Sequence, residues 1–337
     1  MTVTLAQAKL NATDDVDIQA IDEFRKNNFL LDHLTFHDVV SGAGLGATMT
    51  YGYNRVTTQA DAAFRAINSP YVAGEAEKTR FSVDVKPLGG SFEIDRVLNR
   101  VAQGTETAFQ MAQKIKATSA KFNNEVINGD VGVDANGFDG LSKAITGSST
   151  EYLPLANGVT TGYIDLSVSS AYDTEAEWHA VLDHIDAFLG ALDGAPDGLL
   201  MNRQLKTKMV SIARRAGFWT RDKNSFGVPV DAYNGIALVD LGDKSGSTAP
   251  VSGLFSRDAD GAGAGASITN LTDLYAVRFG LDGFHGASMA GAPLVQTWLP
   301  DFSTSGPVKT GEVEMGPVAT VLKATKAAGV LRNFKVA

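Results

Sequence analysis

Residues 105–128 read TETAFQMAQKIKATSAKFNNEVIN, and residues 129–141 continue with GDVGVDANGFDGL. In the first stretch, apolar or small residues recur every three or four positions, which is the period of one face of an α-helix. These residues are Ala108, Ala112, Ile115, Ser119, Phe122 and Val126. The pattern predicts a helix about 36 Å long, because each helical residue adds about 1.5 Å. Asn128-Gly129 predicts the end of this helix, since glycine commonly closes one.

Upstream of this helix, two stretches have the character of β-strands. Residues 48–56 are rich in β-prone side chains, and residues 79–86 alternate apolar with polar side chains. Residues 60–74, between them, are expected to form a polar tip. The pattern predicts a long two-stranded ribbon over 47–86. Because such a ribbon is marginally stable alone in water, we expect it to lie on another surface, which in a self-assembling protein is the neighbouring subunit.

The N-terminal part is predicted to be a polar arm over residues 1–12, followed by an amphipathic helix. Thr13 caps that helix, and apolar residues continue to Leu34. The next segment is glycine-rich and contains Gly42, Gly44 and Gly46. A dinucleotide-binding loop would require a helix after these glycines, but β-prone residues follow them, so a hinge is predicted instead.

From residue 171 onward, helices and strands are predicted to alternate. Thr174 and Glu177 form a capping box that starts one helix, and Asn202 caps a second helix that Gly217 ends. Strands are expected at 199–201, 236–240, 274–279, 294–298, 318–322 and 330–334.

Composition limits the possible functions of this chain. Its 337 residues include no cysteine, which excludes disulfides, thiolate metal sites and a cysteine nucleophile. The net charge is −9 and no stripe of basic residues stands out, which disfavours sequence-specific nucleic-acid binding. We expect neither a signal peptide nor a membrane span.

No motif for catalysis, cofactor binding or metal binding is found, so no catalytic, cofactor-binding or metal-ligating residue is predicted. His179 and His184 are five residues apart, which is not the zinc-binding spacing, and His285 lies in a predicted glycine-rich turn. Asp130 and Asp139 belong to an oxygen-rich segment whose spacing fits a turn better than a calcium loop. Paired carboxylates remain possible among 38 acidic residues, which leaves a cytosolic α+β hydrolase as an alternative.

The order of these features resembles the major capsid proteins of tailed bacteriophages, which have the Hong Kong 97 phage capsid fold. Three motifs carry the resemblance along nearly the whole chain. They are EVINGD at 125–130 with FDGL at 138–141, DGLLMNR at 197–203, and VPV at 228–230 ahead of YNGIALV at 233–239.

The resemblance implies an α+β fold with the parts of that family. They are an N-terminal arm and helix (1–46), an extended two-stranded E-loop (47–86), a discontinuous P-domain with a long spine helix (87–170 and 300–337), and an α/β A-domain (171–299). The implied function is that of a major capsid protein, which forms pentamers and hexamers around the genome of a double-stranded DNA phage. An encapsulin-like shell, which encloses a cargo enzyme, is the alternative within the same fold. A tail or decoration protein is a further alternative.

The resemblance also implies partners. The chain is expected to bind copies of itself, a separate scaffold protein, a portal and a decoration protein. It is expected to enclose DNA without reading its sequence, in a virion assembled in the host cytoplasm. No cofactor or membrane is implied. Covalent cross-linking, known in some members, is not expected, because Lys78 and Lys86 are far from the ribbon's tip and only Asn333 lies near the C-terminus.

Charged residues of the ribbon are the candidates for contacts between subunits, although a solvated surface would explain each of them as well. They are Arg55, Arg65, Glu75, Glu77, Lys78 and Arg80.

Overall fold

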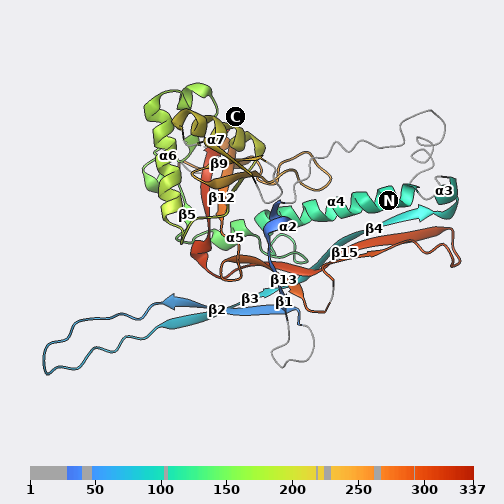
Figure 1. The fold of residues 1–337 in the computed structure, drawn as a ribbon, viewed down its shortest axis with the longest axis horizontal. Coiled ribbons are helices and arrows are strands. Elements are labelled where there is room, and N and C mark those ends of the chain that lie inside the picture. The colour runs from blue at the N-terminus through green and yellow to red at the C-terminus, as the bar shows by residue number, and fades with distance from the viewer. Residues whose placement is uncertain are drawn as a thin grey trace.

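The computed structural model describes residues 29–39, 48–101, 105–217, 219–223, 229–261, 267–291 and 293–337. The molecule is elongated (Figure 1). A two-stranded ribbon projects at one end, a long helix and two long strands extend to the other, and a unit of helices and sheet rises on one side.

The helices in the described residues are α2 (Phe29–His33), α3 (Arg96–Val101), α4 (Thr105–Asn128), α5 (Leu141–Ile145), α6 (Glu175–Gly190) and α7 (Arg203–Ala216). The first eight strands are β1 (Phe36–Val39), β2 (Thr50–Thr58), β3 (Glu77–Asp84), β4 (Lys86–Asp95), β5 (Glu151–Tyr152), β6 (Ile164–Asp165), β7 (Gly198–Met201) and β8 (Trp219–Lys223). The others are β9 (Pro229–Tyr233), β10 (Ile236–Asp240), β11 (Phe255–Arg257), β12 (Ile268–Val277), β13 (Phe284–Met289), β14 (Val295–Trp298), β15 (Val308–Leu322) and β16 (Ala328–Lys335).

The helix predicted over 105–128 is confirmed as α4, but its predicted buried face is only half right. Phe122 and Val126 are fully buried, whereas Ile115 is 42% exposed. The difference arises because the inner half of α4 is enclosed by other elements, with the Phe122 ring beside those of Phe36 and Phe138. The outer half lies along α3, β4 and β15, where Met111 joins Phe92 and Val313 in a small buried apolar cluster.

Gly129 ends α4 by a different means from the left-handed cap that glycine usually provides. Its φ is not positive, and a Cβ there would lie 2.3 Å from the Phe138 carbonyl oxygen and 2.5 Å from that of Glu125. The chain after the helix therefore returns so close to its last turn that no side chain fits between them. The NGD and FDGL motifs meet at this point, where the Gly140 N–H donates to the Gly129 carbonyl oxygen at 2.8 Å.

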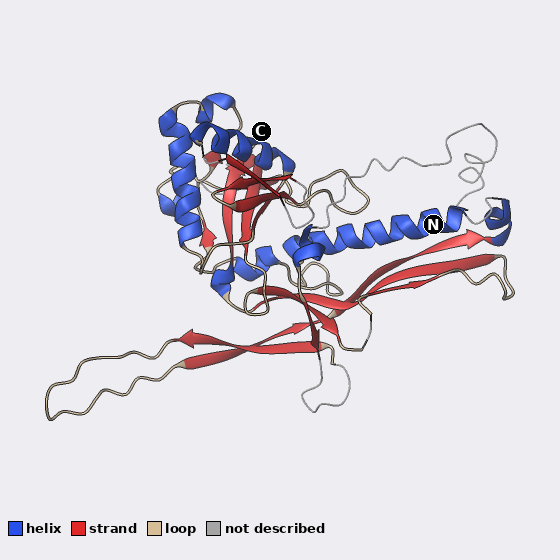
Figure 2. Ribbon diagram, viewed as in Figure 1, coloured by secondary structure: helices blue, strands red, loops and turns tan. Residues whose placement is uncertain are grey.

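Two larger sheets make up most of the strand structure (Figure 2). The five-stranded sheet has the order β1-β13-β15-β14, and β4 also pairs with β15. β15 is its longest strand and pairs with β4 from Val308↔Asp95 to Val318↔Lys86. Further along β15, Leu322 pairs with Phe284 of β13. The predicted strand 318–322 is thus only the last third of β15, and β1, β4 and β13 were not predicted.

The nine-stranded sheet has the order β5-β16-β12-β7-β10-β9-β8, with β6 and β11 at its margins. α6 and α7 pack on it through a shared apolar cluster that includes Ile185, Phe188 and Met209. Both predicted helix starts are confirmed: α6 begins with the Thr174 capping box, and the Leu205 N–H donates to the Asn202 side chain at 2.8 Å.

Strands cross the expected boundary between residues 299 and 300. β16 comes from the stretch assigned to the P-domain but lies in the nine-stranded sheet, whereas β13 and β14 come from the stretch assigned to the A-domain but pair with β15. The position of β16 agrees with its burial: seven of its eight residues are buried, and a strand inside a covered sheet is buried on both faces.

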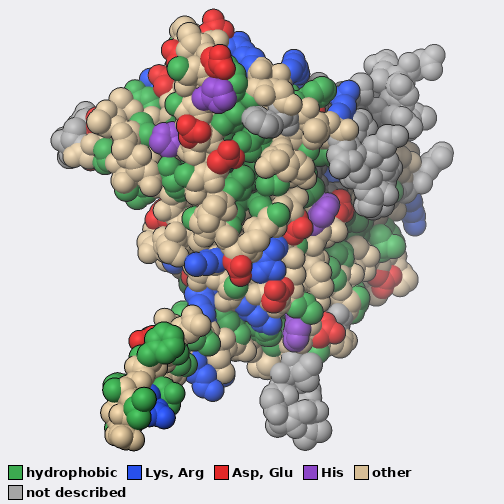
Figure 3. Space-filling model, turned by 60° about the vertical axis from the view of Figure 1, so that its left-hand side comes forward, with side chains coloured by type: hydrophobic (Ala, Val, Ile, Leu, Met, Phe, Trp, Pro, Cys, Tyr) green, Lys and Arg blue, Asp and Glu red, His purple; other side chains and the backbone are tan. Residues whose placement is uncertain are grey.

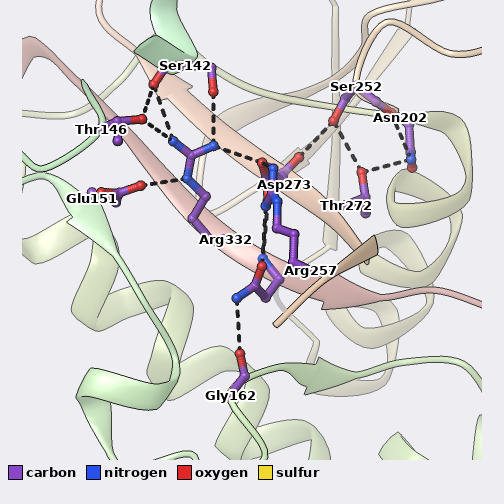
Figure 4. A network of polar contacts seen from close by, with 11 residues as sticks. Ser142, Thr146, Glu151, Gly162, Asn202, Ser252, Arg257, Thr272, Asp273 and Arg332 are labelled. Atoms are coloured by element: carbon purple, nitrogen blue, oxygen red, sulfur yellow. Dashed lines mark hydrogen bonds and ion pairs between the residues drawn. The ribbon is translucent and has the colours of Figure 1, made fainter. Parts of the chain in front are cut away.

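A buried network of charged and polar side chains joins the nine-stranded sheet to α5 (Figure 4). Arg332 Nε donates to Glu151 at 2.8 Å, and its Nη1 donates to Asp273 at 3.0 Å. Arg257 binds both carboxylate oxygens of Asp273, at 2.6 and 2.8 Å. Arg332 also contacts Ser142 of α5. Each buried charge therefore has an opposite charge and further hydrogen bonds, which such groups require for stability.

Candidate assembly surface

The ribbon consists of β2, β3 and the tip that connects them, residues 59–76. β2 and β3 pair antiparallel from Thr50↔Asp84 to Thr58↔Glu77 and belong to neither larger sheet. The predicted ribbon is therefore confirmed. Its outer part projects away from the rest of the chain (Figures 1 and 2).

The tip is more apolar than the sequence analysis predicted. Phe64, Ile67 and Val72 are 108%, 90% and 91% exposed, and Tyr71 is 69% exposed. Figure 3 shows hydrophobic side chains gathered on the projecting ribbon, beside basic ones. Clustered exposed apolar side chains mark interaction sites, because a soluble monomer gains nothing from holding them in water. In the sequence, this apolar surface was indicated only by two aromatic residues within the segment predicted to be a polar tip.

The root of the ribbon, by contrast, is held by the same chain. The root comprises residues 50–55 of β2 and 79–84 of β3. Tyr53 Oη donates to the Leu322 carbonyl oxygen at 3.0 Å, and Arg55 donates to those of Leu322 and Lys323 at 2.7 and 2.8 Å. The Arg55 guanidinium also lies 4.6 Å from the centre of the Phe81 ring. Burial raises the pKa of Tyr53, an effect that the Arg55 charge opposes.

The predicted contact residues all lie on the ribbon but have different surroundings. Arg55 is half-buried and bound within the chain. Arg65 lies over the Tyr71 ring at 5.2 Å and donates to two carbonyl oxygens of the tip. Glu77 accepts from Thr58 across the strands. The remaining three, Glu75, Lys78 and Arg80, are exposed. The predicted hinge glycines Gly42, Gly44 and Gly46 lie outside the described residues.

A cleft of about 520 Å³ lies between the ribbon's root and the loop that follows α4. Phe81, Phe138 and Leu322 are among its apolar lining residues. On its rim, Lys143 forms ion pairs with Asp130 and Asp139. The hydrogen bond to Asp130 raises the pKa of Lys143, and that bond lowers the pKa of Asp130. Within the oxygen-rich segment the Val133 and Asp134 N–H groups donate to the Asp130 carbonyl oxygen at 2.9 Å, which confirms the predicted turn.

A second group of exposed apolar side chains lies at the opposite end of the molecule. Leu299 is 69% exposed, Val97 and Val101 of α3 are 60% and 57% exposed, and Val308 is 42% exposed. They lie near one another because β15 begins beside the end of β4, with Val308 opposite Asp95. Apolar surface is thus available at both ends of the long axis.

The part of the chain that the structure describes contains no group of three or more histidine, aspartate and glutamate side chains placed to hold a metal ion. Among the same residues, no helix combines the length and apolar character needed to span a bilayer.

Comparison with known proteins finds no matching family profile and no matching curated sequence. Solved structures do match along the full chain. The SrpI encapsulin of Synechococcus elongatus PCC 7942 has a TM-score of 0.58 at 14% identity, over 100% of this chain and 97% of that one. A chain of Mycobacterium phage Bobi has a TM-score of 0.57 at 11% identity, over 99% of both chains. The capsid of Myoviridae phage XM1 has a TM-score of 0.52 at 12% identity, over 98% of this chain and 99% of that one.

Proposed function

From the premise that this chain has the Hong Kong 97-type capsid fold, we propose that it is the subunit of a closed protein shell. In the finer form of the proposal, it is the major capsid protein of a tailed double-stranded DNA phage. Pentamers and hexamers of the chain form the wall of the virion, which is assembled in the host cytoplasm. Its role is structural and not enzymatic.

The ribbon's tip is the observation that carries this proposal. Phe64, Ile67 and Val72 are almost fully exposed, and burial of each would contribute about 1.5–3 kcal/mol. A patch at one end that binds a different surface on the next copy is a heterologous contact, which closes into a ring when the rotation allows it. Because every copy makes such contacts on several sides, individually weak contacts suffice for a stable shell.

The charge of the chain suits a container for DNA. With a net charge of −9, the wall lacks the basic surface that would bind phosphate groups tightly. The proposed partners are other copies of the chain and, as in the capsid proteins that it resembles, a separate scaffold protein, a portal and a decoration protein. DNA is enclosed without recognition of its sequence.

We assign the elements of the structure to the parts of the fold expected from the sequence, except that three strands change domain. The ribbon acts as the E-loop, α4 as the spine helix of the P-domain, and α6 and α7 with the nine-stranded sheet as the A-domain. β16 joins the A-domain sheet, and β13 and β14 join the P-domain sheet.

An encapsulin-like shell is the second candidate, and the similarity to the SrpI encapsulin favours it. The two candidates share the assembly surface and differ in what the shell contains.

The first experiment tests assembly. We expect the expressed chain to form closed shells or rings of five and six, visible by negative-stain electron microscopy. The variant Phe64→Ser/Ile67→Ser/Val72→Ser should elute as a monomer in size exclusion with light scattering, with its circular dichroism unchanged.

Val133→Ser is the matched control, because Val133 is 87% exposed but lies in the loop after α4. It should assemble like the parent chain. Assembly of the triple variant at the parent concentration would refute the role of the tip, and a parent chain that is monomeric at every concentration would count against unaided assembly.

The second experiment tests the contents of the shell. Particles made together with the natural genetic neighbours are treated with nuclease and then analysed. Protected DNA supports the phage capsid, whereas a single co-purifying protein without DNA supports the encapsulin-like shell.

A further inference from the structure

His285 is a fully buried histidine in the five-stranded sheet. Its exposed fraction is 0%, and it lies in β13 opposite Val321, not in the glycine-rich turn that the sequence suggested. Neither ring nitrogen has a hydrogen-bond partner of good geometry. Burial of an unpartnered imidazole is unfavourable, and burial of an unpartnered imidazolium is far more so.

The ring lies where the ribbon joins the sheet. The Tyr51 ring, at the start of β2, meets it edge-on with the centroids 5.8 Å apart. The His37 ring of β1 is 6.4 Å away and lies 5.3 Å from the Tyr51 ring. Three aromatic rings from three strands therefore form one contact, and the ribbon contributes Tyr51.

The charges around this contact are mostly positive. Lys323 Nζ lies 5.6 Å from the centre of the Tyr51 ring. The one neighbouring carboxylate that acts on His285 is Asp282, which is already paired with Arg278 at 2.9 Å. Burial lowers the pKa of His285 to about 4, and the charges of Lys323 and His37 add to this effect. The Gly283 backbone and Asp282 oppose it weakly.

We infer that His285 is an acid-sensitive latch of the ribbon: the neutral ring holds the root on the sheet, and protonation releases it. All the contacts lie within one chain, so this inference does not depend on shell assembly. A released root would change the angle of the ribbon without unfolding the nine-stranded sheet, which shares none of these side chains.

The sign of the effect follows from the difference between the closed and open states. In the open state the imidazole is hydrated and titrates near its ordinary pKa of about 6.5. Between that pH and about 4, the open state binds more protons than the closed state, so acid favours opening. With pKa values of about 6.5 in the open state and about 4 in the closed state, the ratio of open to closed molecules should rise about 40-fold from pH 6.5 to 4.5. Above pH 6.5 it should change by no more than about twofold.

Hydrogen exchange of the full chain, read by mass spectrometry on peptides from β2 and β3, measures this ratio. After correction for the intrinsic pH dependence of exchange, the exchange rate at the root should rise about 40-fold between pH 6.5 and 4.5. In His285→Phe, where an apolar ring of similar shape replaces imidazole, this rise should be abolished. His179→Gln, at a half-exposed histidine on α6, should keep the whole response.

Lys323→Gln provides a second test that leaves His285 in place. Without the Lys323 charge, the closed state accepts a proton more readily, so the acid response should shrink but persist. Root exchange in the parent chain that does not change with pH would overturn the inference. So would a full acid response in His285→Phe, which would assign the effect to carboxylates such as Asp84.

Discussion

The nine-stranded sheet and the ribbon differ in which side chains they bury and which they expose. In the sheet, the charged side chains of Arg332 and Asp273 are buried and find partners within the molecule. At the tip of the ribbon, by contrast, large apolar side chains are exposed, and Phe64 is 108% exposed. These buried charges of the sheet are paired within one copy of the chain, whereas the apolar side chains of the tip are left exposed by the described residues. Under the proposed function, the sheet stabilises the fold of each subunit and the tip stabilises the contact between subunits.

The strongest test of this contrast removes a buried charge from the sheet. Arg332→Met leaves Glu151 without its cation and Asp273 with one arginine instead of two, and it should lower the free energy of unfolding by about 3 kcal/mol. Arg80→Met, at an exposed position of the ribbon, should change it by less than about 0.5 kcal/mol. Urea unfolding in the triple tip-variant background measures both, and equal effects would contradict the contrast.

A neutral polar group of the sheet should show a smaller effect. Asn202 is 1% exposed, accepts from the Leu205 N–H and donates to Ser252 and Thr272. Asn202→Ala should cost about 2 kcal/mol, because a helix cap is lost and buried groups are left unpaired. Asn54→Ala, on the exposed face of β2, is the matched control. A loss below about 0.5 kcal/mol in Asn202→Ala would show that its contacts are replaceable.

The root lies between the two extremes. Arg55→Met removes the hydrogen bonds to Leu322 and Lys323 and should destabilise the root by about 1 kcal/mol. Amide exchange in β2 should then accelerate about fivefold while exchange in β12 stays constant. Arg80→Met again serves as the control, and an equal acceleration in β12 would show that the ribbon and the sheet open together.

The smallest effect on stability belongs to the tip. Phe64→Ser should leave the free energy of unfolding of the free subunit within about 0.5 kcal/mol, because no contact within the chain is lost. Differential scanning calorimetry would check this. A clear fall in the melting temperature would place Phe64 in the fold of its own chain.

Strong local signals were readable in the sequence. The length of α4, the cap of α6, the cap of α7 and the ribbon depend on residues near one another in the chain, and all four are confirmed. The resemblance to phage capsid proteins predicted the overall fold. Features that depend on distant partners were missed. β4 has few strand-forming side chains and is stabilised by β15, while β16 lies beside β12 because both are buried.

For the candidate site, the sequence analysis predicted charged contact residues on the ribbon, and these stay predictions. The structure adds the exposed apolar residues of the tip, which the sequence analysis did not single out. Arg55 could not be identified as an internal anchor, since its partners Leu322 and Lys323 are more than 260 residues away.

The place of β15 and β16 in the fold has a consequence for biosynthesis. The five-stranded sheet includes β15 and the nine-stranded sheet includes β16, so neither sheet can be completed before residues 308–335 are synthesised. The hydrogen bond from Tyr53 of the ribbon likewise requires Leu322, which is 269 residues later. At ribosomal speeds of about 5–20 residues per second, that interval is on the order of tens of seconds. The root of the ribbon therefore cannot form its hydrogen bonds to the sheet until Leu322 and Lys323 have been synthesised, so a nascent chain carries an unanchored ribbon through nearly all of its translation.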